Sequence, residues 1–333
     1  MTSAEQHETW MRRAIEVGAS VHGTTSPNPA VGCIIVTRFG QIFEGATEQP
    51  GGRHAEIVAL EFAGRQARGA TLVTTLEPCS HQGRTGPCTN AIIEADIEHV
   101  VIGVRDPDTH VNGRGIEQLR DAGIAVTENV AGEAISQRLR HYLTHRRTGR
   151  PFVTLKSAST LDGKIAAADG TSKWITGTPA RVDAHALRAA HDAIVVGAGT
   201  VRADNPSLTV RHVTGRDPQR VVLGRAPKDA AIHPCWELCG DIEEVLCELG
   251  RRGILSLLVE GGANVAGQFH AAGLVDEYVA YLAPSIMGDI GTTGLFAGVT
   301  TTTIEQMFRC VISDVQRLGD DIKIVMHPTS PPL

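Results

Sequence analysis

The sequence has no long hydrophobic run and no excess of positive charge, and both absences narrow the classes of protein it can represent. Its longest apolar stretches, such as 254–259, are far shorter than the roughly 20 residues of a membrane-spanning helix. The first residues contain no basic segment followed by an apolar one, so we expect no secretory signal. A net charge of −6 argues against a dedicated nucleic-acid binder, because such proteins usually carry a basic patch. We expect neither membrane nor nucleic acid as a partner.

Cysteine is also scarce, with seven residues that lack the spacing of a disulfide framework. Free cysteines suit a reducing compartment, and we therefore expect a cytoplasmic protein. Cys235, Cys239 and Cys247 lie close together in sequence, but their spacings of four and eight and a single nearby histidine do not favour a metal site. We expect these three to pack on one side of a helix or turn.

The length of 333 residues favours two domains, since it exceeds the usual size of one hydrophobic core. Alternating strand and helix patterns in the first half predict an α/β fold. The polar, basic segment 141–151 ends in Gly-Arg-Pro and has the composition of a solvated linker. This places one domain at 1–147 and a second at 151–328, followed by a loose tail.

The first half begins with a helical pattern at 8–19 and continues with buried strands at 31–36, 70–76 and 100–104. Asn28 lies between two prolines at the mouth of the first strand. A turn asparagine that bonds its own backbone explains this position most simply, and a substrate contact is the alternative.

One histidine and two cysteines predict a metal site in the first half. His54 is expected at a helix entrance, Cys79 in the loop after a strand, and Cys88 at a helix start that lowers its thiol pKa. Three protein ligands with a fourth position for water are typical of catalytic zinc. Glu56 is placed to carry the proton of that water, as in the zinc-deaminase signature H-x-E with P-C-x-x-C. The sequence departs from this signature because eight residues separate its cysteines.

The segment between the cysteines contains His81 and Arg84 among turn-forming residues. Arginine offers a planar fork to phosphate oxygens, so this loop is predicted to meet an anionic substrate group near the metal.

The segment P-C-x-H-x-G-R-T-x-P-C, with P-N-P-x-V-G at 27–32, resembles the bifunctional deaminase/reductase family of riboflavin biosynthesis, and the likeness covers nearly the whole chain. It implies a cytidine-deaminase-like three-layer domain followed by a dihydrofolate-reductase-like domain. The implied reactions are zinc-dependent deamination of 2,5-diamino-6-ribosylamino-4(3H)-pyrimidinone 5′-phosphate and NADPH-dependent reduction of the ribosyl group to ribityl. It also implies that Asn28 contacts the base or sugar.

The same resemblance implies a reductase site in the second half. It places NADPH against Ala158, Trp174, Thr200, Asp204, Gly262, Ala263, Asn264, Val265, Ala266, Gly267 and Gln268. It places the substrate against Ser172, Arg188, Leu208, Arg211 and Glu260. Lys156 and Asp204 are our candidates for the proton transfer that accompanies hydride delivery. A strand-end lysine in solvent explains Lys156 equally well.

Two glycine pairs invite a dinucleotide interpretation. Gly197-Ala-Gly199 lacks the third glycine of the fingerprint and has Arg202 in its place, so we interpret it as a turn. Gly261-Gly262 precedes a predicted helix at 263–272 whose free amides favour a pyrophosphate. The alternative is a pair needed only for the strand-to-helix turn. The segment 221–243 is short for the family, so we expect a trimmed edge of the reductase sheet.

Two other functions stay open on sequence alone. A nucleic-acid deaminase shares the zinc set but requires a basic groove and a pocket for a flipped base. A zinc-stabilised module that senses a phosphorylated metabolite would have no use for Glu56. We expect an enzyme with Zn²⁺ and NADPH as cofactors, a small phosphorylated pyrimidine as substrate, and a homo-oligomeric state.

Overall fold

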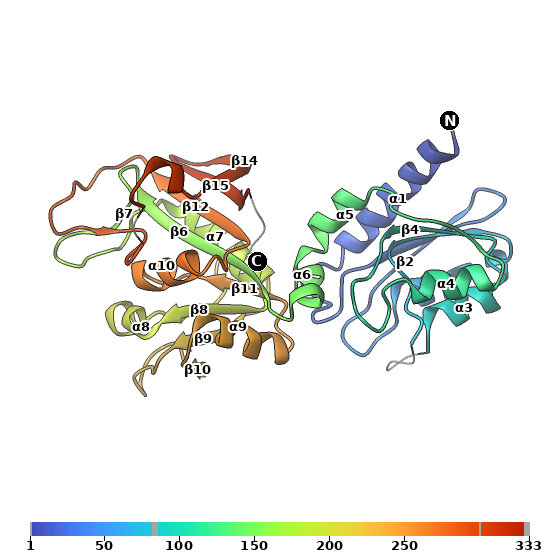
Figure 1. The fold of residues 1–333 in the computed structure, drawn as a ribbon, viewed down its shortest axis with the longest axis horizontal. Helices are drawn as coiled ribbons and strands as arrows, with labels where there is room; N and C mark the ends of the chain where they lie inside the picture. Colours follow the sequence, from blue (N-terminus) through green and yellow to red (C-terminus); the bar gives the residue numbers. More distant parts are fainter. Residues whose placement is uncertain (1, 82–85, 300, 330–333) are drawn as a thin grey trace. The chain divides into compact units, whose positions relative to one another are not determined.

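The computed structural model describes residues 2–81, 86–299 and 301–329, and the chain divides into two units between Gly149 and Arg150 (Figure 1). Within the described residues, no helix combines the length and the apolar character needed to span a membrane. Each unit is built on a sheet of its own.

The first unit contains a five-stranded sheet in the order β2-β1-β3-β4-β5. Strand β1 is antiparallel to β2 and β3, whereas β3, β4 and β5 are parallel. The elements are β1 (Gly32–Val36), β2 (Ile42–Ala46), β3 (Thr71–Leu76), β4 (His99–Val104), β5 (Ala125–Thr127), α1 (Ser3–Ala19), α2 (Ala55–Ala63), η1 (Gly64–Ala67), α3 (Cys88–Glu94), α4 (Arg114–Asp121), α5 (Gly132–Arg138) and α6 (Arg140–Thr148).

Two glycines show that helices cover both faces of this sheet. A Cβ on Gly32 would lie 1.9 Å from the Ala14 carbonyl oxygen of α1, and one on Gly45 would lie 2.3 Å from the Ala55 carbonyl oxygen of α2. Gly32 pairs with Ala46, the neighbour of Gly45, so the two glycines face opposite sides. Helices α1 and α2 therefore pack closely on opposite faces, which confirms the three-layer arrangement.

The segment predicted as a solvated linker is a helix, and that prediction was wrong. Helix α6 buries Tyr142 and Leu143 in the first unit, while Arg147 and Thr148 remain exposed. The helix has few apolar residues, and composition alone does not distinguish such a sequence from a polar linker.

The second unit contains an eight-stranded sheet in the order β10-β9-β8-β11-β6-β12-β15-β14. The strands from β10 to β12 are parallel, and β15 and β14 continue the sheet in antiparallel fashion. The elements are β6 (Phe152–Thr160), β7 (Lys164–Ala166), α7 (Thr178–Ala190), β8 (Ala193–Gly197), α8 (Ala198–Asp204), β9 (Gln219–Leu223), β10 (Trp236–Leu238), α9 (Ile242–Arg251), β11 (Ser256–Val259), α10 (Ala263–Ala271), β12 (Glu277–Ala283), β13 (Thr293–Gly294), η2 (Ile304–Gln306), β14 (Cys310–Leu318) and β15 (Asp321–Pro328).

Buried side chains pack on both faces of this sheet. On one face, Leu155 and Leu257 belong to a cluster that includes Leu246 of α9 and Phe269 of α10. On the other face, Tyr281 packs with Ala184 of α7. Binding sites in open parallel sheets lie outside the carboxyl ends of the strands, which directs attention to the loops after β6, β8 and β11.

Two local expectations require correction, and one strand was not predicted. Gly197 and Gly199 do not form a turn, because β8 passes directly into α8 at Ala198. Cys239, which follows β10, and Cys247 of α9 are exposed rather than packed, whereas Cys235 packs against a hydrophobic cluster. Strand β14 carried no clear signal because nearly all its residues are exposed, whereas pattern reasoning detects strands through burial.

Candidate active sites

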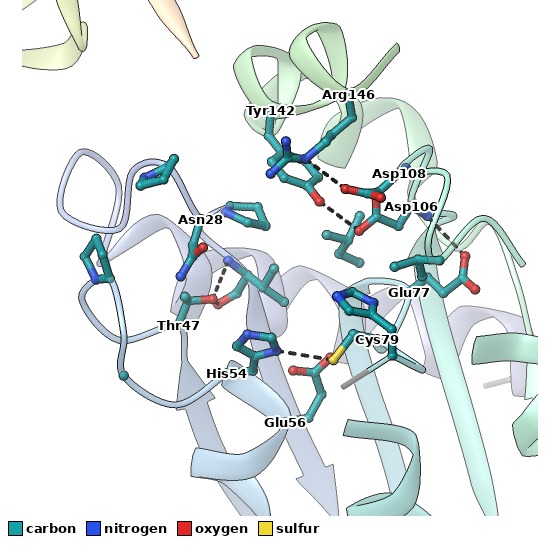
Figure 2. Close-up of a pocket in the computed structure, with 18 of the residues that line it drawn as sticks. Asn28, Thr47, His54, Glu56, Glu77, Cys79, Asp106, Asp108, Tyr142 and Arg146 are labelled. Carbon is teal, nitrogen blue, oxygen red and sulfur yellow. Dashed lines mark hydrogen bonds and ion pairs between the residues drawn. The ribbon is translucent and has the colours of Figure 1, made fainter. Parts of the chain in front are cut away.

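The first unit brings His54, Cys79 and Cys88 together. His54 caps α2, Cys79 follows β3, and Cys88 is the first residue of α3. The Nδ1 atom of His54 lies 3.5 Å from the Cys79 Sγ and 3.3 Å from the Cys88 Sγ, as Figure 2 shows for the first pair. Their ligand atoms all lie within 4.8 Å of one another, and they form the one such histidine, cysteine or carboxylate group found among the described residues.

The three donors fit a tetrahedral zinc ion. Zinc–nitrogen and zinc–sulfur bond lengths place the two donor types about 3.5 Å apart in a tetrahedron, close to the separations found. A hydrogen bond from Cys88 lowers the pKa of Cys79 to about 4, whereas that hydrogen bond and burial raise the pKa of Cys88, contrary to the lowering expected from its position at a helix start. Without a cation only one of these two thiols ionises. A bound metal cation would stabilise both as thiolates, so the donor set is suited to a metal.

Glu56 is buried beside this donor set. It lies in the first turn of α2 with 4% of its surface exposed, and its Oε2 is 3.7 Å from the Cys88 Sγ. Burial, together with the nearby Cys79 charge, raises the pKa of Glu56 to about 7. A carboxyl group that exchanges a proton readily at neutral pH is chemically suited to proton transfer at activated water.

A cavity of about 330 Å³ opens in front of these residues. Asn28 lines it, and the turn there is made by backbone: the Asn28 amide donates to the Thr25 carbonyl at 2.8 Å. His81 also lines the cavity, with its ring 5.9 Å from that of His110. Arg84, the predicted phosphate ligand, lies outside the described residues.

The other wall of this cavity carries residues that the sequence did not single out. Asp106 and Asp108 follow β4, and Tyr142 and Arg146 come from α6 (Figure 2). Two carboxylates directly after a parallel strand, Asp106-Pro-Asp108, are a signal that sequence reasoning could have used.

Glu77 is a further residue that sequence reasoning missed. Its buried carboxylate accepts hydrogen bonds from the backbone amides of Gly113 at 2.9 Å, Gly115 at 3.1 Å and Asp106 at 3.2 Å. Glu77 thereby ties the end of β3 to the start of α4 and to the loop after β4. Because Cys79 follows two residues later, this network fixes the strand end from which the metal loop departs.

The second unit has a cavity of about 550 Å³. Eight of the predicted site residues line it: Lys156, Trp174, Arg188, Thr200, Asp204, Leu208, Arg211 and Glu260. Nine further residues line it that were not predicted, and the basic ones among them are Lys173, Arg181, His185 and His212. The excess of cationic side chains suits a ligand that carries phosphate groups.

Glu260 and Arg188 form a buried pair in this cavity. The guanidinium donates from Nε and Nη2 to the two carboxylate oxygens, at 2.8 Å each. Burial raises the pKa of Glu260, but the Lys156 charge and the Arg188 hydrogen bonds outweigh it and lower the pKa to about 2. Lys156 lies in the middle of β6, 5.7 Å from the Tyr281 ring centroid, so it is not a strand-end lysine in solvent.

The remaining predicted reductase residues are not among the residues that line this cavity. The Ser172 hydroxyl donates to Asp204 at 3.4 Å, and the Gly262 amide at the start of α10 donates to the Thr200 hydroxyl at 3.3 Å. Asn264 and Gln268 are exposed. The side chains of Ala263, Val265 and Ala266 are buried, Gly267 packs against Ala297, and Ala158 packs beside the Tyr281 cluster.

The start of α10 fits a pyrophosphate. Gly261 and Gly262 precede it, and a Cβ on Gly261 would lie 2.4 Å from the Val265 Cβ. The first glycine is therefore needed for packing, and the Gly262 amide at the helix start donates to the Thr200 hydroxyl. Amides at a helix N-terminus favour anionic groups such as the phosphates of NADPH.

Both units match known protein families. Residues 4–104 match the cytidine and deoxycytidylate deaminase zinc-binding region, and residues 151–324 match the RibD C-terminal domain. The chain is thus a two-domain enzyme that joins a zinc-dependent hydrolytic deaminase to an NADPH-dependent reductase, and the expected fold class is confirmed.

Relatives extend this likeness over the whole chain. The riboflavin biosynthesis protein RibD of Corynebacterium ammoniagenes is 46% identical over 85% of this chain and 87% of its own length. That of Bacillus amyloliquefaciens is 38% identical over 96% of both chains. The Acinetobacter baumannii RibD structure, form 1, is 35% identical with a TM-score of 0.92 and covers 98% of this chain and 100% of its own.

A Thermotoga maritima structure described as a diaminohydroxyphosphoribosylaminopyrimidine deaminase/5-amino-6-(5-phosphoribosylamino)uracil reductase is 37% identical, with a TM-score of 0.87 over 98% of this chain and all of its own. The chain belongs to the RibD family of riboflavin biosynthesis. The expectation of a bifunctional deaminase and reductase is confirmed.

Proposed function

We propose that His54, Cys79 and Cys88 hold the zinc ion of the deaminase and that Glu56 carries protons during hydrolysis. The observation that carries this proposal is the buried Glu56 carboxyl group beside three converging metal donors, two of which, His54 and Cys79, line the cavity together with Glu56. A structural zinc site, and hence a metabolite-sensing module, would not require such a carboxyl group.

The substrate of this unit is 2,5-diamino-6-ribosylamino-4(3H)-pyrimidinone 5′-phosphate. Its conversion to the uracil removes the amino group at C2, so the oxygen of water adds to C2 and ammonia leaves. Zinc supplies the activation of water at neutral pH. Glu56 takes one proton from the water and delivers it to the ring nitrogen as the oxygen adds, and it then passes the proton of the added hydroxyl to the departing amine.

The rest of the cavity orients the substrate. We assign the 5′-phosphate to His81 and Arg84, because a guanidinium binds phosphate oxygens through paired hydrogen bonds. Asn28 lines the cavity and is assigned to the base or sugar. C5 lies opposite C2 in a six-membered ring. A substrate with C2 at the metal therefore directs its 5-amino group toward the wall of Asp106, Asp108, Tyr142 and Arg146, here called the far wall.

In the reductase, we assign the substrate to Ser172, Arg188, Leu208, Arg211 and Glu260. NADPH supplies the hydride, and we assign it to Ala158, Trp174, Thr200, Asp204 and the segment 262–268. Lys156, near the Arg188–Glu260 pair, is our candidate proton donor for the oxygen or nitrogen that gains charge as hydride reaches the opened ribosyl carbon. Asp204 remains a second candidate for proton transfer.

Purified protein tests both assignments when it is incubated with the diaminopyrimidinone phosphate, with and without NADPH. We expect a deaminated product in both reactions and a reduced product only with NADPH, distinguished by mass. Reduction of the substrate before its deamination would contradict the proposed order, and absence of deamination by the zinc-loaded protein would contradict the first assignment.

We also propose that the enzyme is a cytoplasmic homo-oligomer that acts on a small molecule and requires neither nucleic acid nor membrane. Strand β14 is the edge of the reductase sheet and exposes Val311, Ile312 and Val315, and Ile322 of β15 is exposed beside it. An apolar exposed edge favours coverage by another chain, here a second copy. All seven cysteines are free, and two of them, Cys33 and Cys88, are buried, which suits a reducing compartment.

Light scattering coupled to gel filtration tests the oligomer. We expect a mass above that of the monomer for the wild type and a monomeric mass for Val311→Lys/Val315→Lys. A monomeric wild type would contradict the proposal, and Phe39→Lys, at an exposed site of the other unit, serves as the control.

A further inference from the structure

Helix α6 contributes to the deaminase cavity although it lies outside the residues that match the deaminase family. The match ends at residue 104, whereas Tyr142 and Arg146, one helical turn apart, line the same cavity as His54 and Glu56. The helix that precedes the second unit in sequence is therefore part of the deaminase site.

Tyr142 is bonded to one carboxyl group of the far wall. Its hydroxyl donates to Asp106 Oδ2 at 2.9 Å, and the backbone amide of Asp108 donates to Asp106 Oδ1 at 2.9 Å. Both oxygens of Asp106 thus have a donor, and its side chain is held in one rotamer. Tyr142 and Asp106 are both buried, so water competes little for this hydrogen bond.

Arg146 holds the second carboxylate. Its Nε lies 3.2 Å from Asp108 Oδ2, and its guanidinium lies over the Tyr142 ring, 4.9 Å from the centroid. The same carboxylate accepts a hydrogen bond from the His110 amide at 2.9 Å. Arg146 and Tyr142 therefore contact each other and one aspartate each, and the four side chains form a connected wall (Figure 2).

This wall lies where the proposed substrate has hydrogen-bond donors. Figure 2 shows His54, Glu56 and Cys79 on one side of the cavity and the two aspartates on the other. The 5-amino group, opposite C2 in the ring, is a donor, and carboxylate oxygens are the matching acceptors. Each aspartate oxygen has two lone pairs, so the contacts with α6 leave capacity for a ligand.

We propose that Tyr142 and Arg146 are positioning residues of the deaminase, which hold Asp106 and Asp108 as acceptors for the 5-amino side of the pyrimidine ring. This inference rests on the proposed function. It identifies α6 as a determinant of substrate affinity rather than as part of the chemistry at C2, because the 5-amino group does not change during the reaction.

The full-length, zinc-loaded protein tests this in steady-state deamination assays of Tyr142→Phe, Arg146→Met and Arg146→Lys. Losing an interaction that is equally strong in the ground and transition states raises KM and leaves kcat unchanged, so we expect KM for the diaminopyrimidinone phosphate to rise about five- to twentyfold in Tyr142→Phe and Arg146→Met. Arg146→Lys keeps a cation near Asp108, so its KM should rise less than that of Arg146→Met. Arg147→Met, on the exposed side of α6, is the matched control and should resemble the wild type.

A substrate analogue without the 5-amino group separates positioning from general packing. The wild type should bind it more weakly, and Tyr142→Phe should cause no further loss. Zinc content and the rate of reduction of the deaminated substrate report whether each variant is folded.

The proposal is overturned if Tyr142→Phe and Arg146→Met keep the wild-type KM, if they lower kcat alone, or if they impair the analogue as much as the substrate. If Tyr142→Phe loses zinc or reductase activity, the comparison of Arg146→Met with Arg146→Lys tests the proposal instead. An equal rise in KM in these two variants would overturn it. Failure of the proposed function has a different signature, because the wild type itself would then not deaminate or Glu56→Gln would remain active.

Discussion

Replacing Glu56 by glutamine should abolish deamination and leave zinc, fold and reduction intact. Glutamine has the same shape as glutamate but does not exchange a proton at neutral pH. The 4% exposure of Glu56 means that bulk water has little access to take over its role. Because burial raises the pKa of Glu56, its charged form is disfavoured in the folded protein, and an uncharged amide should not destabilise the unit.

The expected loss follows from the role of the residue. General acid and base catalysis by a positioned side chain contributes about 10²- to 10⁴-fold, or roughly 3 to 5 kcal/mol of transition-state stabilisation. Glu56 would act on both the water and the leaving amine, so the loss in kcat should reach at least the lower end of this range. KM should change little, because His54, Cys79, Cys88 and the far wall are retained.

Three measurements on one preparation test this prediction. Elemental analysis should give the zinc content of the wild type, mass spectrometry should show deaminated product formed at least about 10²-fold more slowly, and the NADPH-dependent reduction of independently prepared deaminated substrate should be unchanged. Loss of zinc would make Glu56 a ligand and refute its assignment as proton carrier. Retention of deamination would show that another group moves the proton.

Three further predictions follow from the same sites. Arg84→Ala should weaken the use of the phosphorylated substrate by about one to two decades, because a charged hydrogen bond is lost, while a dephosphorylated substrate should be nearly unaffected; equal losses on both would rule out the phosphate role. Lys156→Ala should abolish reduction but retain deamination and NADPH binding by fluorescence titration; unchanged reduction would remove Lys156 from the mechanism, and lost binding would make it a cofactor contact. Burial and the charges of Arg188 and Arg211 lower the pKa of His185 from 6.5 to about 4. Between these two pH values, His185 is protonated in the unfolded chain but not in the folded one. The free energy of unfolding measured in urea should therefore fall between pH 6.5 and pH 4, and His185→Gln should lose less over this window; identical pH dependence in both proteins would contradict the assignment.

The metal donors and Glu56 could be predicted because their positions relative to local elements carry the signal. His54 precedes a helix, Cys79 follows a strand and Cys88 begins a helix, and each of these contexts is readable from a few neighbouring residues. The strand before Gly261 and the helix after it were predicted for the same reason. Short-range patterns therefore located the donors and the α10 turn.

The far wall of the deaminase cavity could not be predicted in this way. Tyr142 lies in a basic segment that resembles a solvated linker, and its burial depends on packing against the loop after β4, 36 residues earlier in the chain. Glu77 likewise lacks a local signal, because its partners Gly113 and Gly115 belong to α4 and its preceding loop. Long-range contacts of this kind follow from the order of the strands in the sheet.

The sequence by itself determined the chemistry available to this protein: two thiols, an imidazole and a carboxylate in a deaminase pattern, and a glycine pair before a helix. These depend on residue types and on spacing within single elements. Only the tertiary structure decided which carboxylates face the metal donors, that Lys156 points into a cavity beside Glu260, and that α6 belongs to the deaminase site. The physical reason is that hydrogen bonds and burial of side chains far apart in sequence exist only after the sheets have assembled and closed the cavities around them.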